Sequence, residues 1–342
     1  MSLPEPVADL QPGTGALIDR FARSHSYLRV SVTDRCNYRC TYCLPAEGVQ
    51  WMQRSHVMSL EEIARAVRAF VGLGVRRVRL TGGEPTVRRG ILDLVRMLKQ
   101  IDGLQDLAMT TNGHLFAPLA QEYADAGLDR VNISIDTVDP EGFKALTRGG
   151  DVHRVLAAIE ASRAAGLGPV KLNCVVVRGV NDAHILDFIQ YFARWPDVIV
   201  RFIEYMPFSG NEAKKKHVPV SEIRQTLFGH YTVEPAERLI GGGPAVNWRL
   251  AETGQVVGFI SPITEHFCHS CNRLRLQADG HLRTCLSRDD TPSLRDLLRG
   301  GIDDGGLQAA IRDMVWAKVP GHEAHQLSDW RAFEGVMTQI GG

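Results

Sequence analysis

The chain has 342 residues, 44% of them hydrophobic, and its 39 basic residues balance 39 acidic ones. This length suits about two domains or one large α/β barrel, and the balanced charge excludes a global attraction to nucleic acid or to an anionic membrane. No apolar run reaches the roughly 18 residues of a membrane-spanning helix, and residues 1–24 lack the apolar core of a secretory signal. Six of the seven cysteines form two tight groups, which is typical of metal binding in a reducing compartment and predicts a cytoplasmic protein.

Strand and helix patterns alternate along the first 206 residues. Residues 1–24 lack periodicity and are expected to form a mobile arm. Ser59 and Glu62 then have the spacing of a capping box, which marks the start of the first helix. The predicted strands cover residues 28–32, 75–80, 107–110, 130–135, 170–177 and 198–203, and the predicted helices between them cover residues 59–72, 91–101, 118–126, 152–165 and 184–194. This alternation predicts six βα units with a parallel sheet, in a domain over residues 25–206.

The pattern changes in the C-terminal region, residues 207–342. Strands are expected there at residues 256–260 and 274–277, and helices near residues 220–227, 294–298 and 307–317. We therefore expect a second, less regular region after the six units.

The first cysteine group, Cys36, Cys40 and Cys43, directly follows the first predicted strand. Three thiolates from one short loop can hold three corners of a cubane iron–sulfur cluster and leave one iron open to a small molecule. The alternatives are three buried structural cysteines or a zinc site. The three-residue step between Cys36 and Cys40 and the absence of a fourth cysteine nearby argue against zinc.

The second cysteine group is Cys268, Cys271 and Cys285. Spacing alone leaves zinc open here, because a histidine could supply a fourth ligand. The candidates are His266, His269 and His281. Arg273 and Arg275 alternate on one face of the predicted strand, where two guanidinium groups suit an anion such as a triphosphate, although a solvated strand face is the simpler alternative.

The first cysteine group, with Tyr42 before its last member, resembles the radical S-adenosylmethionine superfamily. The resemblance implies a partial six-unit (β/α) barrel of the TIM type, with a C-terminal extension over its open side. It also implies a 4Fe-4S cluster whose open iron binds S-adenosylmethionine, which is cleaved to a 5′-deoxyadenosyl radical. Residues 82–85 alone could form an ordinary turn but resemble the superfamily's Gly-Gly-Glu-Pro motif. By resemblance, S-adenosylmethionine would contact Tyr42, Gly83, Ser134 and Met206.

Both cysteine groups together resemble the GTP-cyclising family of molybdenum cofactor biosynthesis, a lyase-class family. This narrower resemblance implies GTP as substrate, a second 4Fe-4S cluster that holds the guanine edge, an external low-potential electron donor and a possible homodimer. The implied GTP contacts are Arg29, Arg79, Thr110, Lys171, Arg273, Leu274 and Arg275, and the implied supporting residues are Arg201, Gly341 and Gly342.

Two other functions remain open from the sequence. A radical S-adenosylmethionine peptide maturase also carries auxiliary clusters, although usually with more than three C-terminal cysteines. A non-catalytic iron–sulfur or zinc protein of electron transfer or sensing would need neither the motif at residues 82–85 nor paired arginines inside a cysteine group.

Overall fold

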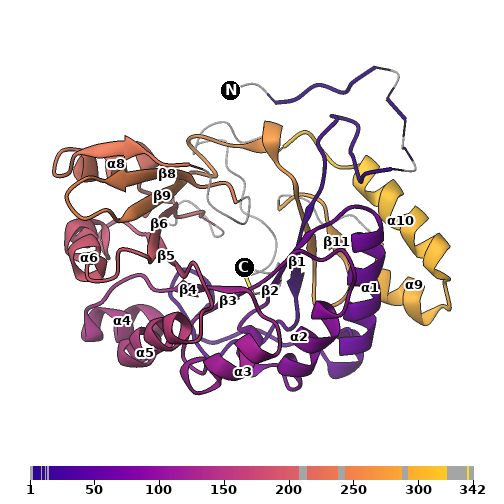
Figure 1. The fold of residues 1–342 in the computed structure, drawn as a ribbon, viewed down its shortest axis with the longest axis horizontal. Helices are drawn as coiled ribbons and strands as arrows, with labels where there is room; N and C mark the ends of the chain where they lie inside the picture. The colour runs from indigo at the N-terminus through magenta and orange to yellow at the C-terminus, as the bar shows by residue number, and fades with distance from the viewer. Residues whose placement is uncertain are drawn as a thin grey trace.

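The computed structural model describes residues 3–8, 10–11, 13, 15–207, 214–237, 243–286, 292–321 and 337–338. The predicted six parallel strands are present and lie side by side in chain order, with the helices on the outer side of the curved sheet (Figure 1). They are β1 (Tyr27–Ser31), β2 (Arg77–Thr81), β3 (Asp106–Thr111), β4 (Arg130–Ser134), β5 (Lys171–Val176) and β6 (Ile199–Glu204).

The outer helices pack their apolar faces against these strands. The capping box of α1 is confirmed, because Ser59 Oγ accepts from Glu62 N at 3.1 Å and Glu62 Oε2 accepts from Ser59 N at 2.7 Å. A helix that we did not predict, α4, follows β4; Asp139 caps it and Pro140 is its first residue. The helices of this part are α1 (Leu60–Gly72), α2 (Ile91–Lys99), α3 (Ala120–Asp125), α4 (Pro140–Thr147), α5 (Val152–Ala164) and α6 (Ile185–Phe192).

The C-terminal region extends the same sheet at both ends. β9 (Val256–Ile260) pairs in parallel with β6, and β10 (Arg273–Leu276) pairs in parallel with β1. Antiparallel strands then flank this row on each side. They are β8 (Val246–Leu250) and β7 (Val233–Pro235) beside β9, and β11 (Leu282–Arg283) beside β10. The predicted α/β fold with a C-terminal extension is confirmed, and the extension also pairs the two strand edges that six units would leave open.

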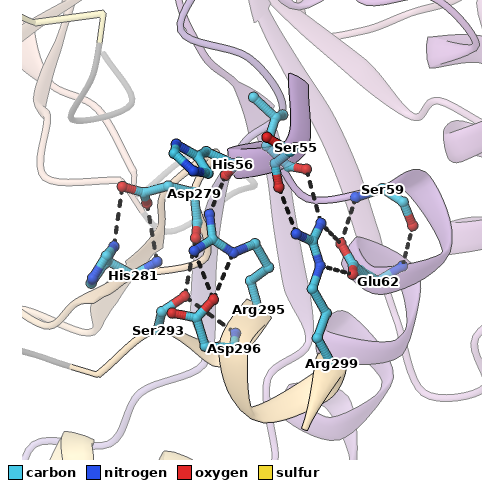
Figure 2. Close-up of polar contacts among 11 residues, drawn as sticks. Ser55, His56, Ser59, Glu62, Asp279, His281, Ser293, Arg295, Asp296 and Arg299 are labelled. Carbon is cyan, nitrogen blue, oxygen red and sulfur yellow. Dashed lines mark hydrogen bonds and ion pairs between the residues drawn. The ribbon is translucent and has the colours of Figure 1, made fainter. Parts of the chain in front are cut away.

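The described residues of the C-terminal region also form three α-helices: α8 (Val220–Phe228), α9 (Leu294–Arg299) and α10 (Asp304–Trp316). Polar contacts hold α9 against the segment between the first cysteine group and α1 (Figure 2). Arg299 Nε donates to Glu62 Oε1 at 2.7 Å, and its Nη1 donates to the carbonyl oxygen of Ser55 at 2.5 Å. Arg295 donates to the carbonyl oxygen of His56. The C-terminal region is therefore fastened to the chain that leads from the first cysteine group.

Part of the expected mobile arm is packed. Leu17 is buried, its N–H donates to the carbonyl oxygen of Leu73 at 3.0 Å, and its carbonyl oxygen accepts from His25 N at 2.8 Å. Residues 17–25 thus lie against the end of α1. No helix in the described part of the chain is long and apolar enough to span a membrane.

Candidate functional site

A cavity of about 360 Å³ lies where the parallel strands end, and all six clustered cysteines line it. Parallel α/β folds place their ligands at this edge, because the loops that follow the strands converge there. The two cysteine groups, more than 220 residues apart in sequence, therefore face one space. Most of the predicted ligand-binding residues also line it, namely Arg29, Tyr42, Arg79, Gly83, Thr110, Ser134, Arg201, Met206, Arg273 and Arg275.

The loop of the first cysteine group is held by residues 82–84. Gly83 N donates to the carbonyl oxygen of Thr33, and Glu84 N donates to that of Arg35, both at 2.8 Å. A Cβ on Gly83 would lie 2.3 Å from the carbonyl oxygen of Arg35, so only glycine fits. The buried Glu84 carboxylate accepts from Thr111 Oγ1 at 2.7 Å, which ties this turn to the end of β3.

Burial disfavours negative charge on the thiols of this loop. Burial raises the pKa of Cys36 to about 11 and that of Cys43 to about 12, and it also raises the pKa of Cys40. Bound iron would stabilise their thiolate forms, since metal binding displaces the thiol proton. A cubane distributes its ligands over four irons, whereas zinc gathers them about 2.3 Å from one centre. Within the described ranges, no group of three or more Cys, His, Asp or Glu residues could hold a single metal ion.

Residues expected to contact S-adenosylmethionine surround the first cysteine group. Tyr42 Oη donates to Asp136 Oδ2 at 2.7 Å, and Val175 N donates to Asp136 Oδ1 at 2.8 Å. Burial raises the pKa of Asp136 to about 6 despite these hydrogen bonds. Ser134, the last residue of β4, and Met206, after β6, also line the cavity.

Three arginines lie directly beside one another on neighbouring strands. Arg29 on β1 is in register with Arg275 on β10 and with Arg79 on β2. We call these three residues the arginine row. Like charges directly opposite in a sheet are destabilising, so the row favours an anionic ligand.

Burial adds to the electrostatic cost of the arginine row. The Nε atoms of Arg79 and Arg275 are buried without a hydrogen-bond partner in the described structure. Burial and the positive charge of Arg273 lower the pKa of Arg275 to about 10. Burial followed by the charge of Arg275 lowers the pKa of Arg29 as well. A polyanion in the cavity would offset both burial and repulsion.

The remaining predicted site residues divide between the cavity and the interior. Arg201 lines the cavity, donates to Asn173 Oδ1 at 2.5 Å, and has a pKa lowered to about 9 by burial and by the charge of Arg79. Lys171 is buried but is not among the lining residues; burial and the charge of Arg201 lower its pKa to about 6. Leu274 packs in the hydrophobic core, because strand alternation turns it away from the face of its neighbouring arginines. Gly341 and Gly342 lie outside the described residues.

Cations flank the second cysteine group. Burial alone would raise the pKa of Cys271, but the charges of Arg273 and Lys318 lower it to about 6. Arg273 Nη2 and Lys318 Nζ each lie 3.8 Å from Cys271 Sγ. None of the three candidate histidines is among the described lining residues, and His281 Nδ1 instead lies 3.1 Å from Asp279 Oδ2. Among the described residues, the metal-binding side chains that the second cysteine group presents to the cavity are therefore its thiols.

Several residues of the site were missed from the sequence. Asn132 and Asn173 line the cavity, and alternation along their strands was the signal that could have identified them. Lys318, after α10, has no local signal at all. Its place beside Cys271 depends on how the whole C-terminal region packs.

Comparison with known proteins adds independent findings. Residues 30–192 match the radical SAM superfamily, and residues 198–324 match the family described as Molybdenum Cofactor Synthesis C. The chain is 45% identical over 325 residues to the GTP 3′,8-cyclase of Moorella thermoacetica, covering 95% of this chain and 99% of that protein. It is 46% identical over 313 residues to the GTP 3′,8-cyclase of Paracoccus denitrificans, covering 90% of each. The crystal structure of Streptococcus suis SuiB bound to S-adenosylmethionine has the same fold, with a TM-score of 0.59 at 14% identity over 84% of this chain and 68% of that chain.

Proposed function

The chain belongs to the GTP 3′,8-cyclase family of radical SAM enzymes, and we propose that its two cysteine groups hold two 4Fe-4S clusters on either side of bound GTP. The enzyme acts in molybdenum cofactor biosynthesis, where it converts GTP to (8S)-3′,8-cyclo-7,8-dihydroguanosine 5′-triphosphate. Membership of the radical SAM superfamily implies one 4Fe-4S cluster and S-adenosylmethionine. The second cluster and all residue roles below are part of the proposal.

Cys36, Cys40 and Cys43 would hold the first cluster. When bound and reduced, this cluster supplies the electron that cleaves S-adenosylmethionine to a 5′-deoxyadenosyl radical. The backbone of Gly83 and the side chains of Tyr42, Ser134 and Met206 would orient S-adenosylmethionine. Hydrogen bonds from Tyr42 and Val175 hold the carboxylate of Asp136, which also lines the cavity.

GTP would lie over the arginine row. The observation that carries this assignment is the register of Arg29, Arg79 and Arg275, whose stacked charges match a triphosphate. Arg273, Thr110 and Arg201 would bind the rest of the nucleotide, with Lys171 beneath them and the backbone of Leu274 alongside. Buried cations in a closed site are fixed before the ligand arrives, so they need little reorganisation.

Cys268, Cys271 and Cys285 would hold the second cluster beside the guanine ring. Gly341 and Gly342 would support the reacting complex. We assign residues 25–206 to the radical SAM barrel and residues 207–342 to a C-terminal region that carries this cluster. An external low-potential electron donor, a cytoplasmic location and a homodimer complete the proposal.

The test is anaerobic incubation of the reconstituted protein with GTP, S-adenosylmethionine and a low-potential reductant, with products separated by liquid chromatography and identified by mass spectrometry. We expect 5′-deoxyadenosine and the cyclised nucleotide in equal amounts. The Arg275→Met variant should keep cleaving S-adenosylmethionine without making the cyclised nucleotide. Equal loss of both products in this variant would contradict the proposed division of the cavity. Cleavage by the unaltered protein with no use of GTP would instead favour a peptide maturase.

A further inference from the structure

Three segments that are far apart in sequence meet behind the second cysteine group. They are residues 17–25, residues 268–273 and residues 318–321. Arg23 connects them, although it is only 7% exposed. Its Nη1 donates to the carbonyl oxygens of Cys268 at 2.9 Å and Pro320 at 2.6 Å, and its Nη2 donates to that of Val319 at 2.7 Å. One guanidinium group therefore ties the main chain of a cysteine to residues 17–25 and to residues 318–321.

The direction of Arg23 is itself fixed. Asp19 is fully buried, and its Oδ2 accepts from Arg23 Nε at 2.7 Å and contacts His25 Nε2 at 2.9 Å. Asp19 Oδ1 accepts from the backbone N–H groups of Phe21 at 2.9 Å and Arg23 at 3.1 Å. The carboxylate thus balances the buried guanidinium and aims it at the three carbonyl oxygens.

Lys318 acts on the neighbouring cysteine. It is 2% exposed, its Nζ donates to the carbonyl oxygen of Arg273 at 2.9 Å, and the same atom lies 3.8 Å from Cys271 Sγ. The following turn lies close to Cys268, since a Cβ on Gly321 would be 2.8 Å from Cys268 Sγ. Residues 318–321 therefore pack closely against two of the three cysteines, Cys268 and Cys271.

We propose that Arg23 and Lys318 are positioning residues for the second cluster, and this inference rests on the proposed assignment of that cluster to Cys268, Cys271 and Cys285. Arg23 fixes the main chain of Cys268 so that its thiol keeps its direction. Lys318 places a positive charge beside the Cys271 ligand, which favours the reduced cluster and raises its reduction potential. Neither residue is among the described lining residues of the cavity, so the proposal gives neither of them a contact with the nucleotide.

The experiment isolates the second cluster in the full chain. The parent protein carries Ala at Cys36, Cys40 and Cys43, so that iron can bind only at the second group. In this parent, Lys318→Met should keep the iron content and shift the reduction potential, followed by electron paramagnetic resonance, to a more negative value. Lys318→Arg restores the charge and should restore the potential. A potential that does not respond to Lys318→Met overturns the role of this charge.

Arg23→Ala in the same parent should release iron to a chelator several-fold faster. The matched control is Arg20→Ala, because Arg20 stacks on the same Phe21 ring but contributes no hydrogen bond to the second cysteine group among the described residues. Equal release rates for Arg23→Ala and Arg20→Ala overturn the positioning role of Arg23.

Iron binding at each cysteine group distinguishes a general folding defect from a wrong cluster assignment. Arg23→Ala is also made in a chain with Ala at Cys268, Cys271 and Cys285, where iron at the first group reports on the fold. Loss of that iron shows that Arg23 is needed for folding in general, and it overturns the inference. A parent that binds no iron at the second group overturns the cluster assignment itself, whereas a parent that binds iron without responding to the variants overturns only the positioning roles.

Discussion

Replacing Arg29 by Met removes the middle charge of the arginine row and keeps most of the length and the apolar stem of the side chain. Parallel strands lie about 4.8 Å apart, and two unit charges at this separation repel by about 3 kcal/mol at an effective dielectric constant of about 20. Arg29 has such a neighbour on each side, in Arg79 and Arg275. The variant without nucleotide should therefore resist denaturant at least as well as the unaltered protein.

Binding of GTP should respond in the opposite direction. A charge-assisted hydrogen bond to a triphosphate contributes about 1.5–3 kcal/mol, so its loss weakens binding about 10- to 150-fold. We would measure the affinity by anaerobic equilibrium dialysis of the reconstituted enzyme with labelled GTP. The unfolding midpoint in guanidinium chloride, measured without nucleotide, gives the stability.

The matched control is Arg77→Met. Arg77 lies on β2, two residues before Arg79, but it is half-buried and is not among the lining residues of the cavity. Its variant should bind GTP as the unaltered protein does. Unchanged affinity in Arg29→Met, or equal weakening in both variants, would refute the assignment of the triphosphate to the arginine row.

Three further predictions concern the cysteine groups and the packed N-terminal segment. Anaerobic reconstitution should give about eight irons per chain, and Ala at Cys268, Cys271 and Cys285 should leave about four; one tightly held zinc in the unaltered protein would contradict this. Gly83→Ala should lose the iron of the first group but keep that of the second, because the added Cβ meets the carbonyl oxygen of Arg35; full iron content would show that the loop can shift. Burial would raise the pKa of Asp19, but the hydrogen bond with His25 and the charge of Arg23 lower it below 3.8. The Asp19 carboxylate therefore stabilises the folded protein above pH 3.8, and this stabilisation is lost as the pH falls through the lowered pKa. Denaturation curves over a pH series should therefore show Asp19→Asn less stable at neutral pH and convergence with the unaltered protein in acid; a constant gap would contradict this.

Local patterns were sufficient for the six βα units and for the cysteine groups, whereas the barrel itself was expected from the family resemblance. The capping box at Ser59 and the apolar runs of the parallel strands are short-range signals, and the structure agrees with them to within a few residues. The helix α4 carried a usable signal as well, an Asp139 N-cap before Pro140, which we did not use. Strands β7 and β11 carried little signal, since they have three and two residues and lie at the sheet edges. β8, next to β7, has five residues but buries only Leu250, so it lacks the apolar run of the central strands.

The arrangement of the site depends on long-range contacts that no local pattern encodes. The arginine row exists only because β1 pairs with β10 in one register, and a slip of one residue would turn Arg275 to the opposite face. The resemblance assigns Lys171 and Leu274 to GTP, but neither side chain lines the cavity in this structure, so these two contacts stay predictions. The roles proposed for Arg23 and Lys318 depend on contacts with cysteines far away in the sequence, which the residues around them do not predict.

The order of strands in the sheet also bears on how the chain folds during synthesis. Strands β1 to β6 pair one after another as they leave the ribosome, so most of the parallel sheet can form early from near neighbours. The outer edges of β1 and β6 stay open until β10 and β9 have been made, more than 50 residues after β6. Open edges of parallel strands are sites of aggregation, and contacts of high sequence separation form slowly. The C-terminal region thus serves as the chain's own edge protection, and a chain that ends at residue 206 should accumulate as insoluble aggregate even though every strand of its six-unit barrel is present.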